Sequence, residues 1–246
     1  MHRLCLESLN VVLVHPANAG NIGATARVLK NFGVKTLILV KPKVSPLHPE
    51  ALSRACKAQD ILYNAVVFNS LEDALAPFHY VVGTTARARY KRSVVFPREI
   101  ASYLTALSGK NKIALLFGPE RTGLTNKVLD MCHALVTIPT APEHSSLNLA
   151  QAVGVILYEL FYHSLTGGAS QRLPRLATSQ ELEAMYKHLI EALSPVGFVL
   201  GGKRGHTYRV LKRLFSKIPL TESDVRVIRG ICRQIIWYVK NSQKKF

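Results

Sequence analysis

The sequence predicts an α/β domain built on a parallel sheet, followed by a small, basic, all-helical module. Two observations carry this prediction. Short, continuous apolar runs alternate with helical patterns over the first part of the chain, which is typical of parallel strands covered by helices on both faces. Beyond residue 174 the strand pattern disappears and amphipathic helical patterns take its place.

The expected strands are short apolar runs that give way to turn residues. They cover residues 9–14, 36–40, 65–68, 80–83, 113–117 and 134–138. Helical patterns lie between and after them, at residues 22–32, 51–58, 71–76, 97–107, 125–131 and 147–165. Gly33 ends the first of these helices, and Pro42, Pro46 and Pro49 mark the loop before the second.

The chain is expected to divide into a domain over residues 1–165, a linker over 166–177 and a helical module over 178–246. The linker is rich in small and polar residues. The module opens with Thr178-Ser179-Gln180-Glu181, a capping-box pattern that starts a helix. Two further helices are expected over 207–215 and from about residue 221 onward.

Composition excludes several classes of protein. No apolar run is long enough to cross a bilayer, and the first eight residues lack the apolar region of a signal peptide. The four cysteines are widely scattered, which argues against a disulfide framework or a zinc site and suits a reducing, cytoplasmic location. The nine histidines form no spaced ligand set, so no metal is expected.

The charge is unusual for a globular chain. The formal net charge is +17, and residues 171–246 contain 15 Lys and Arg against 5 Asp and Glu. Such an excess indicates a polyanionic partner. An anionic membrane surface is the weaker alternative, because no segment is both strongly amphipathic and flanked by bulky apolar anchors.

Three loops combine Gly or Ser with side chains that can do chemistry. They are residues 18–27, 117–124 and 145–152, and each follows an apolar run and leads into a helical pattern. One glycine-rich loop is weak evidence, because glycine also serves ordinary turns. Three such loops at strand-to-helix junctions of one domain indicate a ligand site, since ligands of open α/β sheets bind at the carboxyl ends of the strands.

These three loops resemble motifs 1, 2 and 3 of the SPOUT-class RNA methyltransferases, the α/β-knot enzymes. The loop at residues 83–87 and the basic extension are similar, more narrowly, to the bacterial TrmJ-type tRNA 2′-O-methyltransferases. The resemblance implies S-adenosylmethionine as methyl donor, a deep trefoil knot, an obligate homodimer and a tRNA substrate. It also implies a target ribose on cytidine or uridine at position 32 of the anticodon loop. A ribosomal RNA target stays open.

Motif 1 places Asn21 and Arg27 six residues apart at the start of a helix. A helix start with a surface arginine is the plainer interpretation. The resemblance implies that Arg27 handles the attacking ribose hydroxyl. Guanidinium groups stay protonated at neutral pH, so a fixed cation that stabilises developing alkoxide charge is preferred over a base. Asn21 would hold Arg27 or the ribose in register.

Motif 2 offers Gly118, Glu120 and Arg121 directly after a buried strand. Gly118 would permit close approach of the backbone to the cofactor. The resemblance places Glu120 in the catalytic network, although a simple surface acid is the alternative. Arg121 is a second candidate cation and is expected to contact RNA or a subunit interface.

Motif 3 carries Ser145, Ser146 and Asn148 at the start of the closing helix, where one of the serines could serve only as the N-cap. The resemblance implies that Ser146 and Asn148 face the substrate. It also implies a set of residues that bind the cofactor. That set is Thr84, Thr85, Ala86, Gly118, Ile138, Ser145, Ser146 and Leu147.

Two basic clusters are expected to contact RNA phosphates, one because it lacks a balancing acid and the other because of the positive excess of residues 171–246. The first is Arg87, Arg89, Lys91 and Arg92, and the second is Lys203, Arg204, Arg209, Lys212 and Arg213. A solvated helix face is the alternative for the second cluster, which also contains Tyr208.

Two other classes of protein compete with this prediction. Residues 20–24 resemble half of a dinucleotide fingerprint, but its first glycine is replaced by Asn18, and Lys41 and Lys43 stand where an acid would be needed. A non-catalytic RNA-binding protein would explain the charge, but it would not explain the combination of Asn21, Arg27, Glu120 and Asn148.

Overall fold

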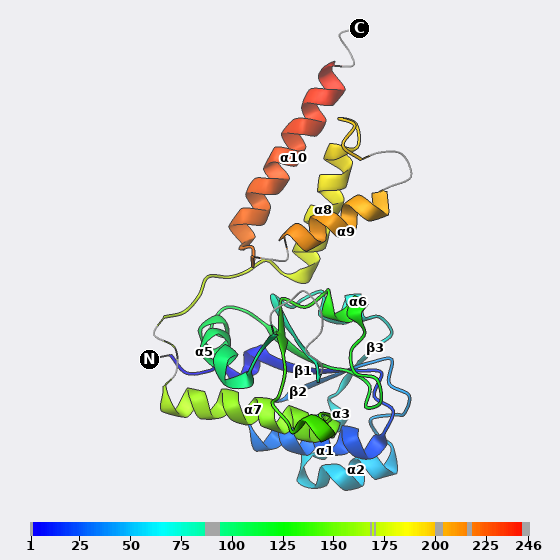
Figure 1. Cartoon of the computed structure of the whole chain (residues 1–246), viewed down its shortest axis with the longest axis vertical. Coiled ribbons are helices and arrows are strands. Elements are labelled where there is room, and N and C mark those ends of the chain that lie inside the picture. Colours follow the sequence, from blue (N-terminus) through cyan, green and yellow to red (C-terminus); the bar gives the residue numbers. More distant parts are fainter. Residues whose placement is uncertain are drawn as a thin grey trace. The chain divides into compact units, whose positions relative to one another are not determined.

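The computed structural model describes residues 2–86, 94–167, 169, 171–199, 204–215 and 218–242. The chain separates into two compact units, Met1–Pro174 and Arg175–Phe246. The first unit contains a seven-stranded sheet in the order β3-β2-β1-β6-β4-β7-β5, and every neighbouring pair is parallel. The predicted α/β architecture with a parallel sheet is therefore confirmed (Figure 1).

The strands follow the apolar runs of the sequence closely. Their bounds are β1 Leu9–Val14, β2 Thr36–Val40, β3 Val66–Phe68, β4 Tyr80–Thr84, β5 Val94–Val95, β6 Ile113–Phe117 and β7 Ala134–Val136. Every residue of β1 and β6 is buried, as expected for central strands covered on both faces. The run predicted as a strand over 134–138 ends at Val136.

Helices of the first unit lie between the strands in sequence. Their bounds are α1 Ala19–Asn31, α2 Pro49–Ala55, α3 Gln59–Tyr63, α4 Leu71–Leu75, α5 Pro97–Leu107, α6 Asn126–Leu129 and α7 Leu149–Thr166. Short 3₁₀ turns occur at Leu6–Ser8, Cys56–Ala58 and Pro142–His144. Gly33 ends α1 with a positive φ of 72°, a conformation that glycine adopts without steric cost.

The two faces of the sheet are covered by different helices. Side chains of β1, β2, β4 and β6 on one face form a buried cluster with α4 and α6, which includes Val12, Leu75 and Leu129. On the other face α7 packs against both α1 and α5. Figure 1 shows α1 and α7 side by side below the sheet.

The helices α1 and α7 run in the same direction, because three pairs of residues meet at matching steps along them. Their N-terminal ends are joined by a hydrogen bond from Asn148 to Asn21. At their C-terminal ends the rings of Phe32 and Phe161 lie 5.8 Å apart. Between these two contacts, a Cβ added at Gly154 would lie 3.8 Å from a methyl carbon of Val28, an ordinary van der Waals distance, so the two helices are in contact here as well.

The second unit is all-helical, as predicted. It contains α8 Ser179–Leu193, α9 Arg204–Phe215 and α10 Glu222–Ser242 around a small core that includes Met185, Tyr186 and Val225. The capping box is confirmed, since the Thr178 hydroxyl accepts from the Glu181 N–H and the Glu181 carboxylate accepts from the Thr178 N–H. Within the described residues, no helix is long and apolar enough to span a bilayer.

Some helix bounds and one short strand differ from the sequence prediction. The closing helix begins at Leu149, two residues later than expected, because Asn148 adopts the N-cap position. The two-residue strand β5 was not predicted, since Val94–Val95 is too short to show a period. The trefoil knot implied by the resemblance stays a prediction.

Candidate cofactor pocket and active site

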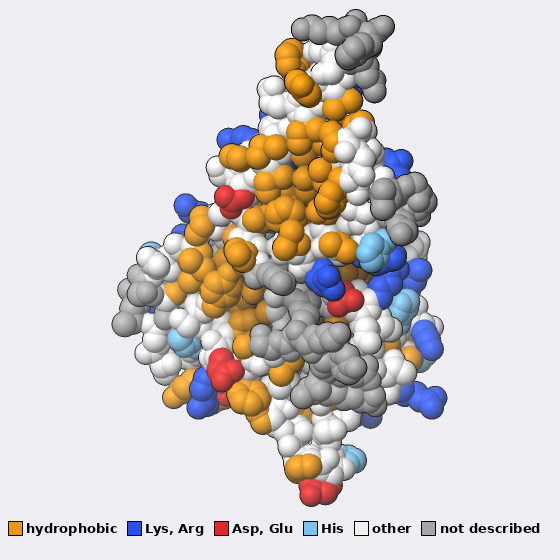
Figure 2. All heavy atoms as spheres, turned by 45° about the horizontal axis from the view of Figure 1, so that its top comes forward, with side chains coloured by type: hydrophobic (Ala, Val, Ile, Leu, Met, Phe, Trp, Pro, Cys, Tyr) orange, Lys and Arg blue, Asp and Glu red, His pale blue; other side chains and the backbone are white. Residues whose placement is uncertain are grey.

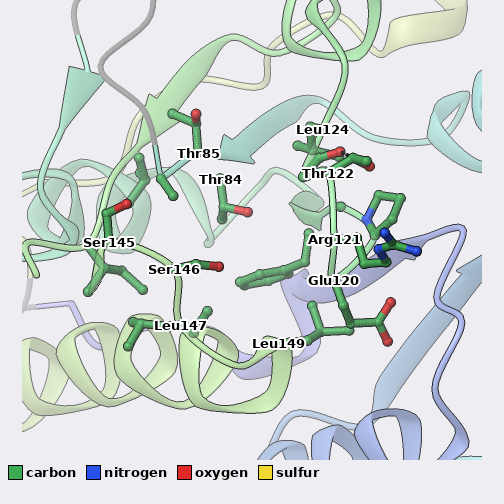
Figure 3. A pocket seen from close by; sticks show the side chains of 18 residues that line it. Thr84, Thr85, Glu120, Arg121, Thr122, Leu124, Ser145, Ser146, Leu147 and Leu149 are labelled. Atoms are coloured by element: carbon green, nitrogen blue, oxygen red, sulfur yellow. Dashed lines mark hydrogen bonds between the residues drawn. The ribbon is translucent and has the colours of Figure 1, made fainter. Parts of the chain in front are cut away.

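A pocket of about 230 Å³ opens where β4, β6 and β7 end. This edge of the sheet is where an open α/β fold binds ligands, because the loops that leave the carboxyl ends of neighbouring strands converge there. Figure 3 shows the pocket lined by the loop after β4, the loop after β6 and the segment that leads into α7.

All eight residues expected to bind the cofactor line this one pocket. They are Thr84, Thr85, Ala86, Gly118, Ile138, Ser145, Ser146 and Leu147. The lining combines hydroxyl groups with apolar side chains such as Phe117 and Leu149. This combination suits a nucleoside, which needs an apolar slot for its base and polar groups for its ribose. Their role in binding stays a prediction.

Backbone and side-chain hydrogen bonds fix the loop after β4. The Thr84 hydroxyl donates to the Leu116 carbonyl oxygen at 2.9 Å, and the Thr85 N–H donates to the Val136 carbonyl oxygen at 3.0 Å. The first bond reaches β6 and the second reaches β7. The loop is thereby held between two strands whose own loops also line the pocket.

Gly118 is required by the loop after β6 itself. A Cβ added at this position would lie 2.3 Å from both the Gly123 carbonyl carbon and the Leu124 nitrogen. The loop closes on itself through a hydrogen bond of 2.8 Å from the Gly123 N–H to the Pro119 carbonyl oxygen. The loop itself therefore requires glycine at position 118. A close approach of the cofactor to Gly118 stays a prediction.

Glu120 joins motif 1 to motif 2. Its carboxylate accepts hydrogen bonds from the Ala17 N–H at 3.2 Å, the Asn18 N–H at 3.1 Å and the Asn21 side-chain amide at 3.1 Å. Figure 3 shows the Glu120 side chain turned toward the blue N-terminal ribbon that carries these donors. Through these hydrogen bonds Glu120 holds the start of α1 against the loop after β6. Its predicted place in a catalytic network stays a prediction.

Two opposing effects set the pKa of Glu120. Burial raises the pKa, but hydrogen bonds from its own N–H, from Asn21 and from the backbones of Ala17 and Asn18 outweigh burial, and the pKa lies below its ordinary value. Glu120 is therefore a carboxylate at neutral pH. A weakly basic carboxylate that already accepts several hydrogen bonds orients its neighbours and is a poor general base.

Asn148 and Asn21 extend the same network. The Asn148 side-chain N–H donates to the Asn21 side-chain oxygen at 2.8 Å, while the Asn148 oxygen caps α7 by accepting from the Ala150 and Gln151 N–H groups. The N-cap is therefore Asn148, whereas Ser145 and Ser146 lie exposed before the helix and line the pocket. Asn21, Glu120 and Asn148, three predicted catalytic residues, are brought together.

Arg27 lies apart from this network within one chain. It is exposed on α1, and its Nη1 lies 3.6 Å from the Cys56 sulfur. Arg27 lies six positions after Asn21 in the helix, which is a rise of about 9 Å along the axis. The two side chains therefore point to different sides of the helix. Of the two expectations for Asn21, a contact with Arg27 is not seen within the chain, because the Asn21 side chain bonds Glu120 and Asn148 instead. Its other expected role, holding the ribose, stays a prediction.

The predicted RNA-binding residues are spread over both units. Arg121 is exposed and lines the pocket. On α9, Arg204, Arg209 and Arg213 are exposed, whereas the Lys212 ammonium lies 2.6 Å from a Glu183 carboxylate oxygen. The remaining five, Arg87, Arg89, Lys91, Arg92 and Lys203, lie outside the described residues.

Sequence reasoning missed the part played by Asn18. Its side chain caps α1 by accepting from the Asn21 N–H at 2.9 Å, while its own N–H donates to Glu120. An Asn immediately before a helical pattern is a recognised N-cap signal, so the cap was predictable. The bond to Glu120 was not, because about a hundred residues separate the two partners along the chain.

Comparison with known proteins identifies the family. Residues 8–158 match the SpoU rRNA Methylase family, and residues 180–245 match the tRNA methyltransferase TrmJ, C-terminal domain. A Citrobacter koseri relative, tRNA (cytidine/uridine-2′-O-)-methyltransferase TrmJ, is 38% identical over 94% of this chain and 97% of its own. A Pseudomonas aeruginosa relative, tRNA (cytidine/uridine/adenosine-2′-O-)-methyltransferase TrmJ, is also 38% identical. That match covers 92% of this chain and 93% of the relative.

Solved structures agree with these relatives. TrmJ from Z. mobilis ZM4 superposes with a TM-score of 0.78 at 33% identity, covering 92% of this chain and 98% of that one. An AdoMet-bound rRNA methyltransferase from Sinorhizobium meliloti superposes with a TM-score of 0.52 at 27% identity, covering 66% and 59%. Because the family match spans more than half of the sequence and the relatives match nearly all of it, the chain belongs to the SpoU rRNA methylase family.

Proposed function

We propose that this protein uses S-adenosylmethionine to methylate the 2′-hydroxyl of a ribose in tRNA. The observation that carries the proposal is that all the expected cofactor residues line one pocket at the ends of β4, β6 and β7. The target we propose is cytidine or uridine at position 32 of the anticodon loop. The names of the TrmJ relatives support tRNA cytidine and uridine as the substrate class.

The bound cofactor would supply an electrophilic methyl group to the attacking oxygen. Thr84, Thr85, Ser145 and Ser146 provide hydroxyl groups for the polar parts of such a ligand, and Ile138 and Leu147 provide apolar contacts. The Asn21–Glu120–Asn148 network lies beside this pocket and fixes the ends of α1 and α7. In this proposal it holds the ribose side of the site rigid.

We further propose that the active form is a homodimer. The helix α7 exposes an apolar stripe whose members recur at steps of three or four residues. They are Val155 at 38%, Tyr158 at 51%, Tyr162 at 48% and Leu165 at 59% exposure. The Tyr158 and Tyr162 rings are stacked 5.8 Å apart. Apolar surface at this spacing on one helix suits packing against a second copy.

A dimer also gives Arg27 a function. Within one chain its guanidinium lies away from the Asn21–Glu120–Asn148 network, although α1 packs directly beside α7. A second copy packed on the α7 stripe would bring its Arg27 to the neighbouring pocket. There a fixed cation would stabilise the alkoxide that develops as the 2′-hydroxyl loses its proton.

We assign catalysis to the first unit and additional RNA contacts to the second, and we place the reaction in the cytoplasm. The second unit carries most of the excess positive charge, which favours phosphate binding. A ribosomal RNA target is the competing function, since the first unit matches a family named for rRNA methylation.

Mapping of 2′-O-methylated nucleotides in total RNA distinguishes these targets. A strain that lacks the gene is expected to lose one modification in the anticodon loop of several tRNAs and to keep all ribosomal 2′-O-methylations. Loss of a ribosomal methylation with intact tRNA would favour the competing function. No change in either RNA, together with retained RNA binding by the protein, would indicate a non-catalytic RNA-binding protein.

A further inference from the structure

One side of α10 carries a line of cations with an indole among them, here named the α10 cation stripe. Its members recur at steps of three or four residues, which places them on the same side of a helix. They are Arg226, Arg229, Arg233, Trp237 and Lys240. None of them belongs to the basic clusters predicted from the sequence.

All five side chains are exposed, and Trp237 is 62% exposed. The face of α10 that packs into the second unit is formed instead by Val225 and Cys232, with Ile228 beside them. The stripe therefore contributes little to the core of its unit. Figure 2 shows apolar side chains gathered on this unit with Lys and Arg side chains at their margin.

The charges of the stripe are largely free of acidic partners. Across the described parts of the chain, neither Arg229 nor Arg233 has a carboxylate oxygen within 4.0 Å. Arg226 pairs with Glu222 at 3.0 Å, but Glu222 also pairs with Arg175 at 2.6 Å. An exposed pair of this kind contributes little and is readily exchanged for a phosphate.

Trp237 is the single tryptophan of the chain. An indole left mostly in water forgoes the stabilisation that burial of a large apolar surface brings. Between cations, its flat face suits stacking on a nucleobase. A base offers this face only where it is unstacked, as in loops and single strands, so the stripe favours unpaired RNA over a continuous duplex.

We propose that the α10 cation stripe holds an unpaired stretch of the substrate tRNA, with its arginines on phosphates and Trp237 stacked on one base. From Arg226 to Lys240 the helix rises about 21 Å, which is long enough for several nucleotides. This inference rests on the proposed function, since it assigns to the tRNA substrate a contact remote in sequence from the methylation loops.

The fluorescence of Trp237 tests the stacking directly, because the full-length protein has no other indole. Occupancy is measured in parallel from the anisotropy of labelled RNA. At equal occupancy, tRNA and a single-stranded oligonucleotide should quench the emission strongly, whereas a fully paired RNA duplex and inorganic polyphosphate should not. Equal quenching by polyphosphate, or no quenching at saturating tRNA, would overturn the proposal.

Variants separate stacking from charge. Trp237→Ala should weaken tRNA binding about tenfold, the scale of one lost base–aromatic stack, while Trp237→Phe should retain most of the affinity. Unchanged affinity in Trp237→Ala would contradict the proposal. Circular dichroism and thermal melting establish that each variant is folded, and a misfolded Trp237→Ala leaves the quenching comparison in the unaltered protein as the deciding measurement.

The arginines are tested by a charge-matched pair of triple variants. Arg226→Gln/Arg229→Gln/Arg233→Gln should lower the slope of log affinity against log salt by about 2, because about 0.7 is lost per phosphate released from a single strand. The control is Lys35→Gln/Lys57→Gln/Lys110→Gln, which removes the same charge from exposed positions of the first unit. Equal changes in both variants would show that only net charge matters.

Methylation kinetics keep this proposal separate from the proposed function. Loss of the stripe should raise the KM for tRNA and leave kcat at saturating tRNA close to normal. A protein that methylates no tRNA but still shows base-dependent quenching would contradict the proposed function and leave the stripe standing. Normal methylation of tRNA without quenching of Trp237 would contradict the stripe proposal and leave the proposed function standing.

Discussion

The side chain of Asn148 caps α7 and, through its amide N–H, donates to the Asn21 side-chain oxygen at 2.8 Å. Asn21 in turn donates to Glu120 at 3.1 Å. The Asn148 amide therefore joins motif 3 to motif 1, and the Glu120 carboxylate joins motif 1 to motif 2. The three loops predicted from the sequence are connected physically by these two hydrogen bonds.

Two replacements of Asn148 should distinguish its role as the N-cap of α7 from its hydrogen bond to Asn21. Asn148→Ala should lower the free energy of unfolding by about 1 kcal/mol, the usual cost of losing an N-cap, and should reduce methylation. Asn148→Ser keeps a capping oxygen but loses the amide donor, so it should retain most of the stability and still lose activity. Urea unfolding and methylation assays measure the two effects. Equal activity in Asn148→Ser and the unaltered protein would show that the link to Asn21 is dispensable.

The lowered pKa of Glu120 predicts acid sensitivity of the network. A carboxyl group whose pKa is lower in the folded state stabilises the protein above its unfolded-state pKa, and this contribution is lost as the pH falls through the folded-state pKa. Burial acts in the opposite direction but is outweighed by the hydrogen bonds. The difference in unfolding free energy between the unaltered protein and Glu120→Gln should therefore shrink below the ordinary Glu pKa of about 4.3.

Denaturant unfolding at a series of pH values measures this difference. Between pH 6 and 9 the difference should stay constant, since Glu120 is ionised throughout that range. Asp224→Asn is a useful comparison, because the pKa of Asp224 is also lowered, there by hydrogen bonds from Thr221 in the second unit. A difference for Glu120→Gln that grows as the pH falls would contradict the assigned network.

Cofactor binding should respond to the volume of residue 152. Ala152 belongs to α7 and lines the pocket, so Ala152→Leu should fill space that the ligand needs and weaken S-adenosylmethionine binding at least tenfold. Gln151→Leu places the same side chain at the adjacent, exposed position, and this variant should bind S-adenosylmethionine normally. Calorimetry compares the two. Undiminished affinity in Ala152→Leu would place the cofactor elsewhere.

Gly118→Val is a less specific test of the same site. A branched side chain would collide with the backbone of Gly123 and Leu124, so the loop must move before any ligand binds. We expect this variant to lose cofactor affinity together with thermal stability. Loss of affinity alone, with an unchanged melting temperature, would show that the loop accommodates the side chain and that the ligand is excluded directly.

The sheet and most helices were predictable because their signals are local. Buried strands such as β1 and β6 are continuous apolar runs, and the bounds of both agree with the prediction. Gly33 and the capping box at Thr178 fix helix ends through the chemistry of single residues. Elements without such signals were missed, including the two-residue strand β5 and the short helix α3.

The residues that line the pocket were predictable, whereas the hydrogen bonds between the loops were less so. Sequence motifs brought the pocket residues together correctly, yet the choice of Asn148 over Ser145 or Ser146 as N-cap depends on where α7 begins. The partners of Glu120 lie about a hundred residues away in sequence, so no local pattern reveals them. The separation of Arg27 from Asn21 was predictable, because side chains six positions apart in a helix do not lie on the same face.

Arg27 should be needed for turnover and dispensable for cofactor binding. Arg27→Ala should lower kcat about a hundredfold or more, the scale of losing one preorganised partner of a developing oxyanion. Arg27→Lys should rescue little, because a flexible point charge does not reproduce the planar guanidinium. Single-turnover methylation is measured beside calorimetry with S-adenosylmethionine. A near-normal rate in Arg27→Ala would move the role to another cation, with Arg121 next.

Mixed dimers test whether Arg27 acts across subunits. With S-adenosylmethionine held well below the weakened Kd of Ala152→Leu, neither Arg27→Ala nor Ala152→Leu should be appreciably active alone. Mixing them creates dimers in which one pocket is intact and faces an intact Arg27. Activity should then recover to about a quarter of normal for random mixing of equal amounts, by the arithmetic of a two-fold symmetric interface. No recovery, or a monomeric active protein in sedimentation, would contradict the dimer.

The most direct test of the central claim is methyl transfer by the purified, full-length protein. Labelled S-adenosylmethionine is supplied with unmodified tRNA, and the product nucleotide is mapped by its resistance to alkaline cleavage. We predict one 2′-O-methyl group per tRNA, on the cytidine or uridine at position 32. A protein that binds both ligands and transfers no methyl group to tRNA, or that methylates a base instead of a ribose, would contradict it.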